Sequence, residues 1–388
     1  AMNKILDLFE PLSIENINLR NAANRVLAVD AIANRSQPPF ASSAMDGYAV
    51  RNIDVKTGRT LRVIGESVAG DVFDGIVKDG EAVRIFTGAP VPVGADRILI
   101  QEDCNRDGAV IEVRDFIDSN RYIRPAGGDF KAGDVISAPR LLSAGDIALL
   151  ASMNCEILQV YRKPSVALIA TGDELVMPGE NPGPCQIISS NNFGLKALIE
   201  ANGGQARILP IASDEMGSLK AVLELASQAD VIVTLGGASV GERDLVRAVA
   251  TEAGLDQAFY KVAMRPGKPL IAGKLNGKAM IGLPGNPVSS MVCGTVFLIP
   301  ALRVMLGLGK AQMPREVAAL GRDIDRNGSR SHYLRARLTL SDGSLTCTPQ
   351  RHQDSSLLSI LANSDALLVR DPNDPPRKKG EFVEFIRL

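Results

Sequence analysis

Four short apolar segments in the middle of the chain constrain its fold more than any other feature. Each is rich in β-branched residues and apolar almost throughout; they are SVALIA (165–170), ARILPI (206–211), DVIVTL (230–235) and KAMIGL (278–283). Runs of this kind are typical of parallel strands buried on both faces. Amphipathic helix patterns lie between them, and in one pattern Ser190 or Asn191 fits the N-cap and Gly203 fits the terminating glycine. This alternation predicts an open, doubly wound α/β domain over residues 164–305.

The regions on either side of this domain have different patterns. Residues 3–40 carry a helical pattern with polar breaks. From about 45 to 140, short apolar runs alternate with Gly, Pro and Asp turns, which is typical of small β-sheets. Residues 314–388 return to the period-two alternation of a small β-domain.

Composition excludes several classes of function. The net charge is −1, with 45% hydrophobic and 22% charged residues, as in an ordinary globular protein. This balance gives no reason to expect a surface for nucleic acid or anionic membranes. We find no signal peptide and no apolar run of the roughly 18 residues that a membrane span needs. We therefore expect a cytoplasmic protein that contacts neither membrane nor nucleic acid.

Cysteine and histidine usage narrows the chemistry further. The five cysteines are scattered and form no CxxC pair, so neither a zinc knot nor a disulfide framework is indicated. The two histidines, His332 and His352, lie far along the chain from the glycine-rich loops. A Ser-His-Asp or Cys-His mechanism is therefore disfavoured. We expect the chemistry to depend on carboxylates, cations and backbone amides.

The loops that follow the four apolar segments carry acidic residues and glycines. They are TGDEL (171–175), ASDE (212–215), GGASVGERD (236–244) and PGNPVSS (284–290). In a doubly wound sheet, ligands bind beyond the carboxyl ends of the strands. Glycines let backbone N–H groups approach an anion, and Asn286 and Pro287 fit the N-cap and first position of a helix whose N-terminus adds positive charge. Together the loops predict a site for a phosphate-type ligand.

Each loop alone has a simpler interpretation. A GG-x-x-x-G or PGNP sequence is more often an ordinary tight turn, and Asp173 or Asp214 alone could be a helix cap. The convergence of four such loops on one sheet edge favours the binding site.

Three further segments stand out: SSAMDGYAV (42–50), FTGAPVPVGAD (86–96) and MRPGKPL (264–270). Alone, the last would be a solvated basic loop. In order along the chain, SAMDGYAV, TGAPVP, IRPAGGDFKAGD, ATGDEL, GGASVGERD, RPGKPL and LPGNPVSS resemble the MoeA-type molybdopterin molybdenumtransferases, a family that includes the E domain of gephyrin. The likeness covers about residues 20–370, and the ordered set is far more specific than any one motif.

The resemblance implies an elongated four-domain protein that works as a homodimer. The implied divisions are a segmented linker and dimerisation domain (1–40 and 121–163), a small β-rich domain (41–120), an α/β molybdopterin-binding domain similar to the molybdopterin adenylyltransferase fold (164–305), and a small C-terminal β-barrel (306–388). The implied reaction takes adenylylated molybdopterin and molybdate, cleaves the adenylate and releases AMP. Because acidic residues would repel a pyrophosphate, Mg²⁺ is also implied.

The resemblance also assigns roles to residues of this sequence. The positions matching the family's catalytic residues are Asp46, Thr87, Glu174, Asp214 and Asp244, of which Glu174, Asp214 and Asp244 would bind Mg²⁺. The substrate-binding positions are Thr171, Gly172, Gly236, Gly237, Ser239, Gly241, Pro284, Gly285, Asn286 and Pro287. The molybdate-binding positions are Arg265, Lys268, Ser289 and Arg335. Asp46 and Thr87 are expected to reach the site from the other subunit.

The sequence departs from the family pattern at two places. Ala41 and Ser42 stand where an Asp-Asn pair is common, and Arg265 stands where a lysine is common, which keeps the charge but changes its shape. Two alternatives stay open: a non-catalytic scaffold of the gephyrin kind, and a molybdopterin adenylyltransferase. Further partners implied are that adenylyltransferase and the molybdoenzymes that receive the product.

Overall fold

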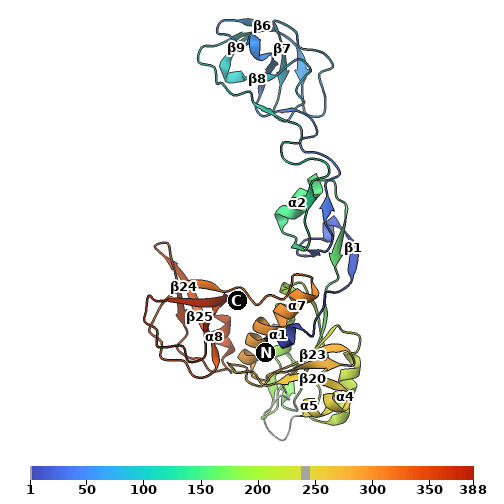
Figure 1. Ribbon diagram of the computed structural model, residues 1–388, viewed down its shortest axis with the longest axis vertical. Helices are drawn as coiled ribbons and strands as arrows, with labels where there is room; N and C mark the ends of the chain where they lie inside the picture. Colours follow the sequence, from blue (N-terminus) through green and yellow to red (C-terminus); the bar gives the residue numbers. More distant parts are fainter. Residues whose placement is uncertain (1, 237–244) are drawn as a thin grey trace.

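The computed structural model describes residues 2–236 and 245–388. The chain is elongated and hook-shaped, with a β-rich tip at one end, a slender stalk, and an α/β domain beside a barrel at the other end (Figure 1). The catalytic positions predicted from the sequence are therefore divided between parts of the molecule that lie far apart.

The α/β domain is built on a six-stranded sheet. In order across the sheet the strands are β18 (Gln205–Ile208), β15 (Ser165–Ala170), β19 (Val231–Leu235), β23 (Lys278–Leu283), β22 (Ile271–Leu275) and β20 (Leu255–Tyr260). The first four are parallel, as predicted. β22 runs antiparallel to β23, and β20 runs antiparallel to β22; these two strands were not expected. The second apolar segment forms a strand only to Ile208, because Pro210 has no N–H to continue the ladder.

Helices cover both faces of this sheet. They are α3 (Asn191–Ala201), α4 (Met216–Leu225), α5 (Leu245–Glu252), α6 (Pro287–Cys293) and α7 (Ile299–Met305), with a π turn (Gly294–Leu298) joining the last two. Val166 and Leu168 of β15 pack in one core with α3, α6 and α7, and the alternating Ala167 and Ile169 pack in the other with α4 and α5. Both faces are therefore buried, which explains the uniformly apolar strands.

The predicted ends of α3 are confirmed. Ser190 occupies the N-cap position, although its side chain makes no capping hydrogen bond. Gly203 follows the C-cap with a φ of 84°, in the left-handed region that suits glycine.

The segment Pro287–Met305 is a continuous helical stretch of 19 residues. By length and composition it could cross a membrane, so the prediction that no such run exists was wrong. In the described structure 89% of its most apolar window is buried inside the protein, where it forms the central helix of a core. Its apolar character is explained by this packing.

The stalk shows that the helical interpretation of residues 3–40 was wrong. Only α1 (Met2–Leu6) and a 3-10 turn (Leu19–Asn21) are helical there. The stalk elements are β1 (Ile14–Asn18), β2 (Val26–Leu27), β3 (Ala31–Ile32), β12 (Val135–Ile136), β13 (Arg140–Leu141), α2 (Ala144–Ser152) and β14 (Ile157–Tyr161). Ile14 pairs with Tyr161, far along the chain, so long-range strand pairing overrides the local pattern.

The tip is a second six-stranded sheet. Across the sheet the strands are β8 (Arg97–Ile100), β5 (Gly47–Val50), β7 (Glu81–Ile85), β6 (Thr60–Ser67), β10 (Val110–Val113) and β9 (Cys104–Asp107). Two 3-10 turns (Asn52–Asp54 and Gln101–Asp103) and the pair β4 (Ser42–Ser43) and β11 (Ile123–Arg124) complete it.

The C-terminal sheet closes on itself through pairing of β25 with β27, and this confirms the predicted barrel. Its elements are β21 (Met264–Arg265), β24 (Glu316–Leu320), β25 (Ser331–Ser341), β26 (Ser344–Pro349), α8 (Leu358–Ala362), β27 (Ala366–Arg370) and β28 (Phe382–Arg387). Leu367 and Ile386 pack in the same core as α6 and α7, which fixes the barrel against the α/β domain.

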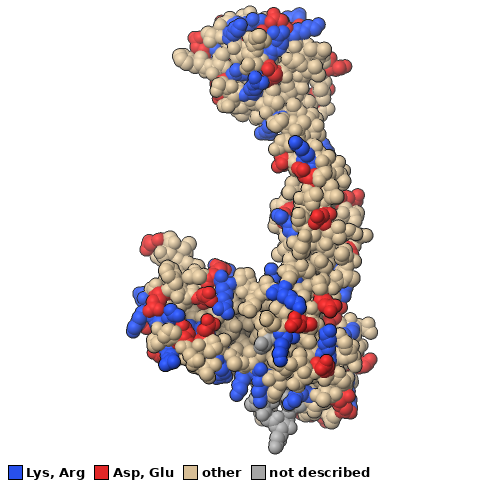
Figure 2. All heavy atoms as spheres, in the orientation of Figure 1, with Lys and Arg blue, Asp and Glu red and all other residues tan. Residues whose placement is uncertain are grey.

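We propose the four-part division expected from the sequence, because β1 and β14 join the two halves of the stalk. One adjustment is needed: Ile5, Leu6 and Phe9 pack in the core of the α/β domain, so we assign the first residues to that domain. On the face shown in Figure 2, basic and acidic side chains are interspersed along the molecule, as the small net charge suggests.

Candidate functional site

A cavity of about 730 Å³ lies at the carboxyl ends of β15, β19 and β23. The chain leaves β15 toward β18 on one side and later returns to β19 on the other, so this is the switch point of the sheet. The predicted site residues that line it are Thr171, Gly172, Glu174, Asp214, Gly236, Pro284, Gly285, Asn286, Pro287 and Ser289. Loops far apart in sequence are thus brought to one place.

Two glycines let the turns after β15 and β19 approach each other. A Cβ atom on Gly236, whose φ is 93°, would lie 2.9 Å from the carbonyl oxygen of Thr171. Gly172 has a φ of 140°, and a Cβ there would lie 2.3 Å from Oε2 of Glu174. Larger residues at either position would be strained and would push into the wall of the cavity.

The turn from β23 into α6 is held rigidly at the cavity. Nδ2 of Asn191 donates to the carbonyl of Gly285 (2.7 Å), and the Ser290 hydroxyl donates to the carbonyl of Pro284. Asn286 and Pro287 occupy the N-cap and first helical positions, as predicted. Nδ2 of Asn286 donates to Oγ of Ser355 (3.0 Å), so its side chain ties the turn to the barrel. The fixed N-terminus of a long helix therefore presents partial positive charge to the cavity.

Two carboxylates face this positive wall. Glu174 and Asp214 both line the cavity, and the backbone N–H of Asp214 donates to Oδ1 of Asp173 (3.0 Å). Within residues 2–236 and 245–388, neither the Glu174 nor the Asp214 carboxylate has an ion-pair partner. Both carboxylates therefore offer oxygen ligands that no cation of the described residues occupies.

Four predicted positions lie outside the described residues. They are Gly237, Ser239, Gly241 and the proposed metal ligand Asp244. Among the described residues no cluster of three or more His, Cys, Asp or Glu side chains could hold a metal ion. Glu174 and Asp214 are thus the acidic part of the site that the structure describes.

The predicted molybdate residues divide into two groups. Ser289 lines the cavity, whereas Arg265, Lys268 and Arg335 lie outside its described wall. Arg265 and Lys268 flank Gly267, whose Cβ would lie 2.4 Å from Sγ of Cys293 in α6, so the basic turn packs closely on that helix.

Arg335 is 1% exposed and is held at both ends of its guanidinium. Its Nε donates to Oε1 of Gln353 (3.1 Å) and its Nη1 donates to the carbonyl of Asp354 (2.8 Å). In the described part of the chain Nη2 has no partner, although it is buried. Burial, with Arg265 and Arg335 nearby, lowers the pKa of His332 to about 4, so this imidazole is neutral.

Asp46 and Thr87 lie together beside β5 and β7 of the tip sheet. Figure 1 shows the tip at the far end of the molecule from the α/β domain that carries the cavity. Oδ1 of Asp46 accepts from both the backbone N–H and the hydroxyl of Thr87, each at 2.7 Å. These bonds, with the backbone bond contributing most, lower the pKa of Asp46 below its ordinary value. The carboxylate is therefore ionised, with Oδ2 directed elsewhere.

Sequence reasoning missed several residues that line the cavity. They are Leu175, Ile187, Ile188, Ser189, Pro269 and Ser356, with Ser190 and Asn191 recognised only as possible helix caps. Leu175 and Ile187 are paired in the two-stranded ribbon β16 (Leu175–Val176) and β17 (Ile187–Ile188). The polar run SSNN before α3 was a usable signal, whereas Ser356 comes from the barrel side, and no local pattern could have placed it here.

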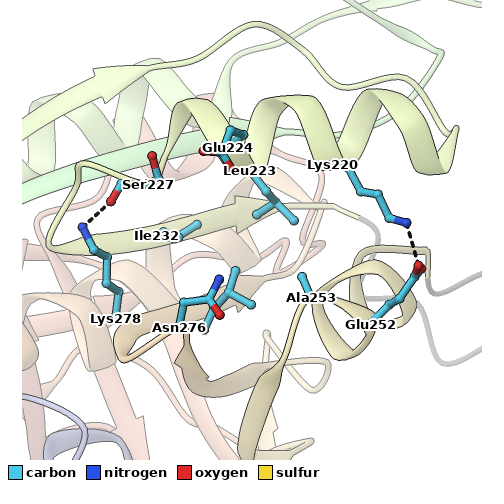
Figure 3. A pocket seen from close by; sticks show the side chains of 10 residues that line it. Lys220, Leu223, Glu224, Ser227, Ile232, Glu252, Ala253, Asn276 and Lys278 are labelled. Atoms are coloured by element: carbon cyan, nitrogen blue, oxygen red, sulfur yellow. Dashed lines mark hydrogen bonds and ion pairs between the residues drawn. The ribbon is translucent and has the colours of Figure 1, made fainter.

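A second hollow, of about 320 Å³, lies between α4 and α5 at the opposite end of the sheet (Figure 3). Nζ of Lys220 pairs with Oε1 of Glu252 at 2.7 Å, and Nζ of Lys278 donates to the carbonyl of Ser227 (Figure 3). Nζ of Lys278 also donates to the carbonyl of Ala229 (3.0 Å). Both lysines and Glu252 are thus already engaged, and the other charged residue that lines this pocket is Glu224.

Comparison with known proteins agrees with the motifs along the whole chain. Residues 1–154 match the MoeA N-terminal region (domains I and II), residues 167–304 match a probable molybdopterin-binding domain, and residues 317–388 match the MoeA C-terminal region (domain IV). The chain is 35% identical to the molybdopterin molybdenumtransferase of Haemophilus influenzae over 99% of this chain and 96% of that protein. It is 33% identical to the molybdopterin molybdenumtransferase of a Nostoc species over 96% of this chain and 88% of that protein.

Solved structures agree with the sequence relatives. The structure resembles the molybdopterin biosynthesis MoeA protein of Pyrococcus horikoshii with a TM-score of 0.82 and 30% identity, over 100% of this chain and 98% of that one. The resemblance inferred from the motifs is confirmed. The chain belongs to the MoeA family, the molybdopterin molybdenumtransferases of molybdenum cofactor biosynthesis.

Proposed function

We propose that the chain takes adenylylated molybdopterin and molybdate, cleaves the adenylate and releases AMP with the molybdenum-loaded pterin. The observation that carries this proposal is the cavity at the switch point, where glycine turns and a helix N-terminus meet two carboxylates. Such a cavity suits a phosphorylated substrate. Its volume of about 730 Å³ is within the roughly 300–1,000 Å³ typical of small-molecule sites.

The backbone amides of the turns would hold the phosphate groups. Gly236 and Gly285 both line the cavity, and because a glycine has no side chain of its own a ligand can approach its backbone closely. These groups are fixed before the ligand arrives, so little reorganisation is needed when charge develops at the phosphorus.

Mg²⁺ fits the acidic side of the cavity. Glu174 and Asp214 supply hard oxygen ligands, and the structure gives neither of them a competing cation among the described residues. We propose that they bind Mg²⁺ together with Asp244. The ion would supply screening of the negative charge that the pyrophosphate brings beside these carboxylates.

Molybdate is a dianion and needs a basic pocket of its own. Arg265 and Arg335 lie near each other and near His332, Lys268 follows Arg265 in the same turn, and Ser289 lines the cavity. We propose that this basic group, with Ser289, binds molybdate. Neutralising its charge would let it approach the adenylate phosphorus, which is also anionic.

We propose that the working form is a homodimer in which Asp46 and Thr87 enter the cavity of the partner subunit. Within one chain the tip and the cavity lie at opposite ends of the hook (Figure 1). The stalk also exposes large apolar side chains that a second copy could cover: Ile14, Val29, Ile32, Val135, Leu141 and Ile157, each between 41% and 56% exposed. We place this dimer in the cytoplasm, between an adenylyltransferase and the recipient molybdoenzymes.

One assay tests the proposed reaction directly. The purified protein is mixed with adenylylated molybdopterin, Mg²⁺ and molybdate, and free AMP is measured with time. Molybdate-dependent AMP release supports the proposal. Transfer of AMP onto molybdopterin would instead identify an adenylyltransferase, and absence of both activities would favour a scaffold.

A further inference from the structure

The C-terminal barrel carries a basic groove that the proposed reaction does not use. It is a hollow of about 510 Å³ beside the hairpin of β25 and β26. The polar residues that line it are Arg322, Arg337, Thr339, Thr348, Gln350, Arg351 and His352. None of its described lining residues is acidic.

The cations of the groove come from separate segments that the barrel brings together. Arg337 of β25 pairs in register with Thr348 of β26, so the two side chains share one face of the hairpin. Arg322, after β24, is fixed by two hydrogen bonds: its Nε donates to the carbonyl of Pro349 (2.9 Å) and its Nη2 to the carbonyl of Gln350 (2.8 Å). At least one guanidinium is thus held in place without a ligand.

The carboxylates close in sequence to Arg322 and Arg351 have hydrogen-bond partners of their own. Asp323 accepts hydrogen bonds from Nζ of Lys378 (3.0 Å) and the backbone N–H of Lys379 (2.8 Å). Asp354 accepts from Ser356. Within residues 2–236 and 245–388, neither Arg337 nor Arg351 has an ion-pair partner or a side-chain hydrogen bond. The groove therefore presents exposed arginine side chains that are available to an anionic ligand.

We propose that this groove is a binding site for a small polyvalent anion of the phosphate type, separate from the cavity at the sheet edge. Guanidinium groups pair with phosphate oxygens through two parallel hydrogen bonds, and the hydroxyls of Thr339 and Thr348 can donate to the same oxygens. A monovalent ion would gain little from exposed arginines, whereas an anion with two or more phosphate groups can contact several at once. The phosphates could belong to a free polyphosphate or to a nucleotide.

The groove is connected to the cavity by the segment 350–356. Arg322 holds its first residue through the carbonyl of Gln350, and Arg335 holds its middle through Gln353. At its end, Ser355 accepts from Nδ2 of Asn286 (3.0 Å) and from the backbone N–H of Val288 (3.1 Å), both at the start of α6. An anion in the groove is therefore expected to slow amide hydrogen exchange across 350–356.

Calorimetric titration of the full chain with inorganic pyrophosphate at low salt tests the site. Arg337→Ala/Arg351→Ala should weaken binding at least about tenfold, since it removes two charge-assisted contacts. Arg106→Ala/Arg121→Ala removes the same net charge from the tip and should change the affinity by less than about twofold. Lys268→Ala, beside the cavity, should also leave this binding intact, and thermal unfolding checks that each variant is folded.

Amide hydrogen exchange measured with and without pyrophosphate locates the bound ligand. A parallel titration with ATP shows whether the phosphates belong to a nucleotide or to a free polyphosphate. Tighter binding of ATP than of pyrophosphate would assign a nucleotide, and equal binding would assign free polyphosphate. Unchanged pyrophosphate affinity in the groove variant would overturn the proposal. So would an equal loss in the tip control, because the effect would then reflect net charge alone.

Discussion

The cavity of the α/β domain and the Asp46–Thr87 pair of the tip each supply part of the proposed active site, and they are constructed differently. The cavity lies where glycine turns at Gly236 and Gly285 meet the N-terminus of α6. The tip offers one ionised carboxylate, held by two hydrogen bonds from Thr87. The cavity can bind a ligand by its shape, whereas the tip can only add a group to a site that exists elsewhere.

This comparison has a physical consequence for mutation. Changes to the carboxylates should affect chemistry with little cost in stability, because both groups lie in loops outside the cores. Changes that alter the closely packed turns, such as Gly236 with a φ of 93°, should affect binding and stability together.

The largest expected effect is that of Glu174→Ala. Removal of this carboxylate should lower AMP release by at least about a hundredfold, because the Mg²⁺ site loses a ligand. Glu215→Ala is a matched control, since it removes an equal charge just beyond Asp214 in the same exposed loop, outside the described cavity wall. The rate of AMP release at saturating Mg²⁺ is measured for both variants and compared. AMP release at the wild-type rate from Glu174→Ala would show that this carboxylate is not part of the proposed site.

The second prediction tests the separation of tip and cavity. Asp46→Asn and Glu174→Gln should each be inactive alone, but mixing them after mild dissociation should restore activity. Half of the random dimers are mixed and one of their two clefts carries no mutation, so about a quarter of wild-type AMP release is expected. Background activity despite heterodimers shown by mass spectrometry would place both groups in one chain.

A smaller effect is expected from Lys268→Ala. The molybdate concentration needed for half-maximal AMP release should rise roughly tenfold, the loss expected for one charge-assisted contact. The affinity for adenylylated molybdopterin should change much less, because Lys268 lies outside the described cavity wall. Equal weakening for both ligands would show that Lys268 supports the turn rather than the anion.

The smallest effect on activity is expected at the opposite end of the same sheet. Asp230 accepts from Arg162 and Ser165, and although burial opposes it, these partners lower the pKa of Asp230 to about 2. Because the folded pKa lies below the ordinary value of 3.8, the stabilisation is present above about pH 4 and is lost as the pH falls toward 2. Asp230→Asn should cost about 2 kcal/mol of unfolding free energy at pH 7.

Urea unfolding at pH 7 and at pH 3 measures this cost. The difference in unfolding free energy between Asp230→Asn and the unmutated protein should be smaller at pH 3 than at pH 7. AMP release per folded molecule should be the same for both proteins. A loss of activity equal to that of Glu174→Ala would contradict the division between the two ends of the sheet.

Local chemistry made parts of the molecule predictable from sequence. The bounds of β15 and β23 follow the apolar segments, because strands buried on both faces are made mostly of apolar residues. The start of α6 follows from Asn286 and Pro287, which occupy the predicted N-cap and first helical positions. Where the local pattern was ambiguous, as in residues 3–40, pairing with distant strands decided the outcome.

The sequence by itself determined the family, the α/β domain and the loops that meet at its edge, because each depends on short-range patterns and on the order of motifs. Tertiary structure alone placed Ser356 on the cavity, buried Arg335 at 1% exposure and separated Asp46 from Glu174. It also gathered Arg322, Arg337 and Arg351 around one groove. These positions depend on how barrel, stalk and sheet pack together, and contacts between residues so far apart along the chain leave no local pattern to read.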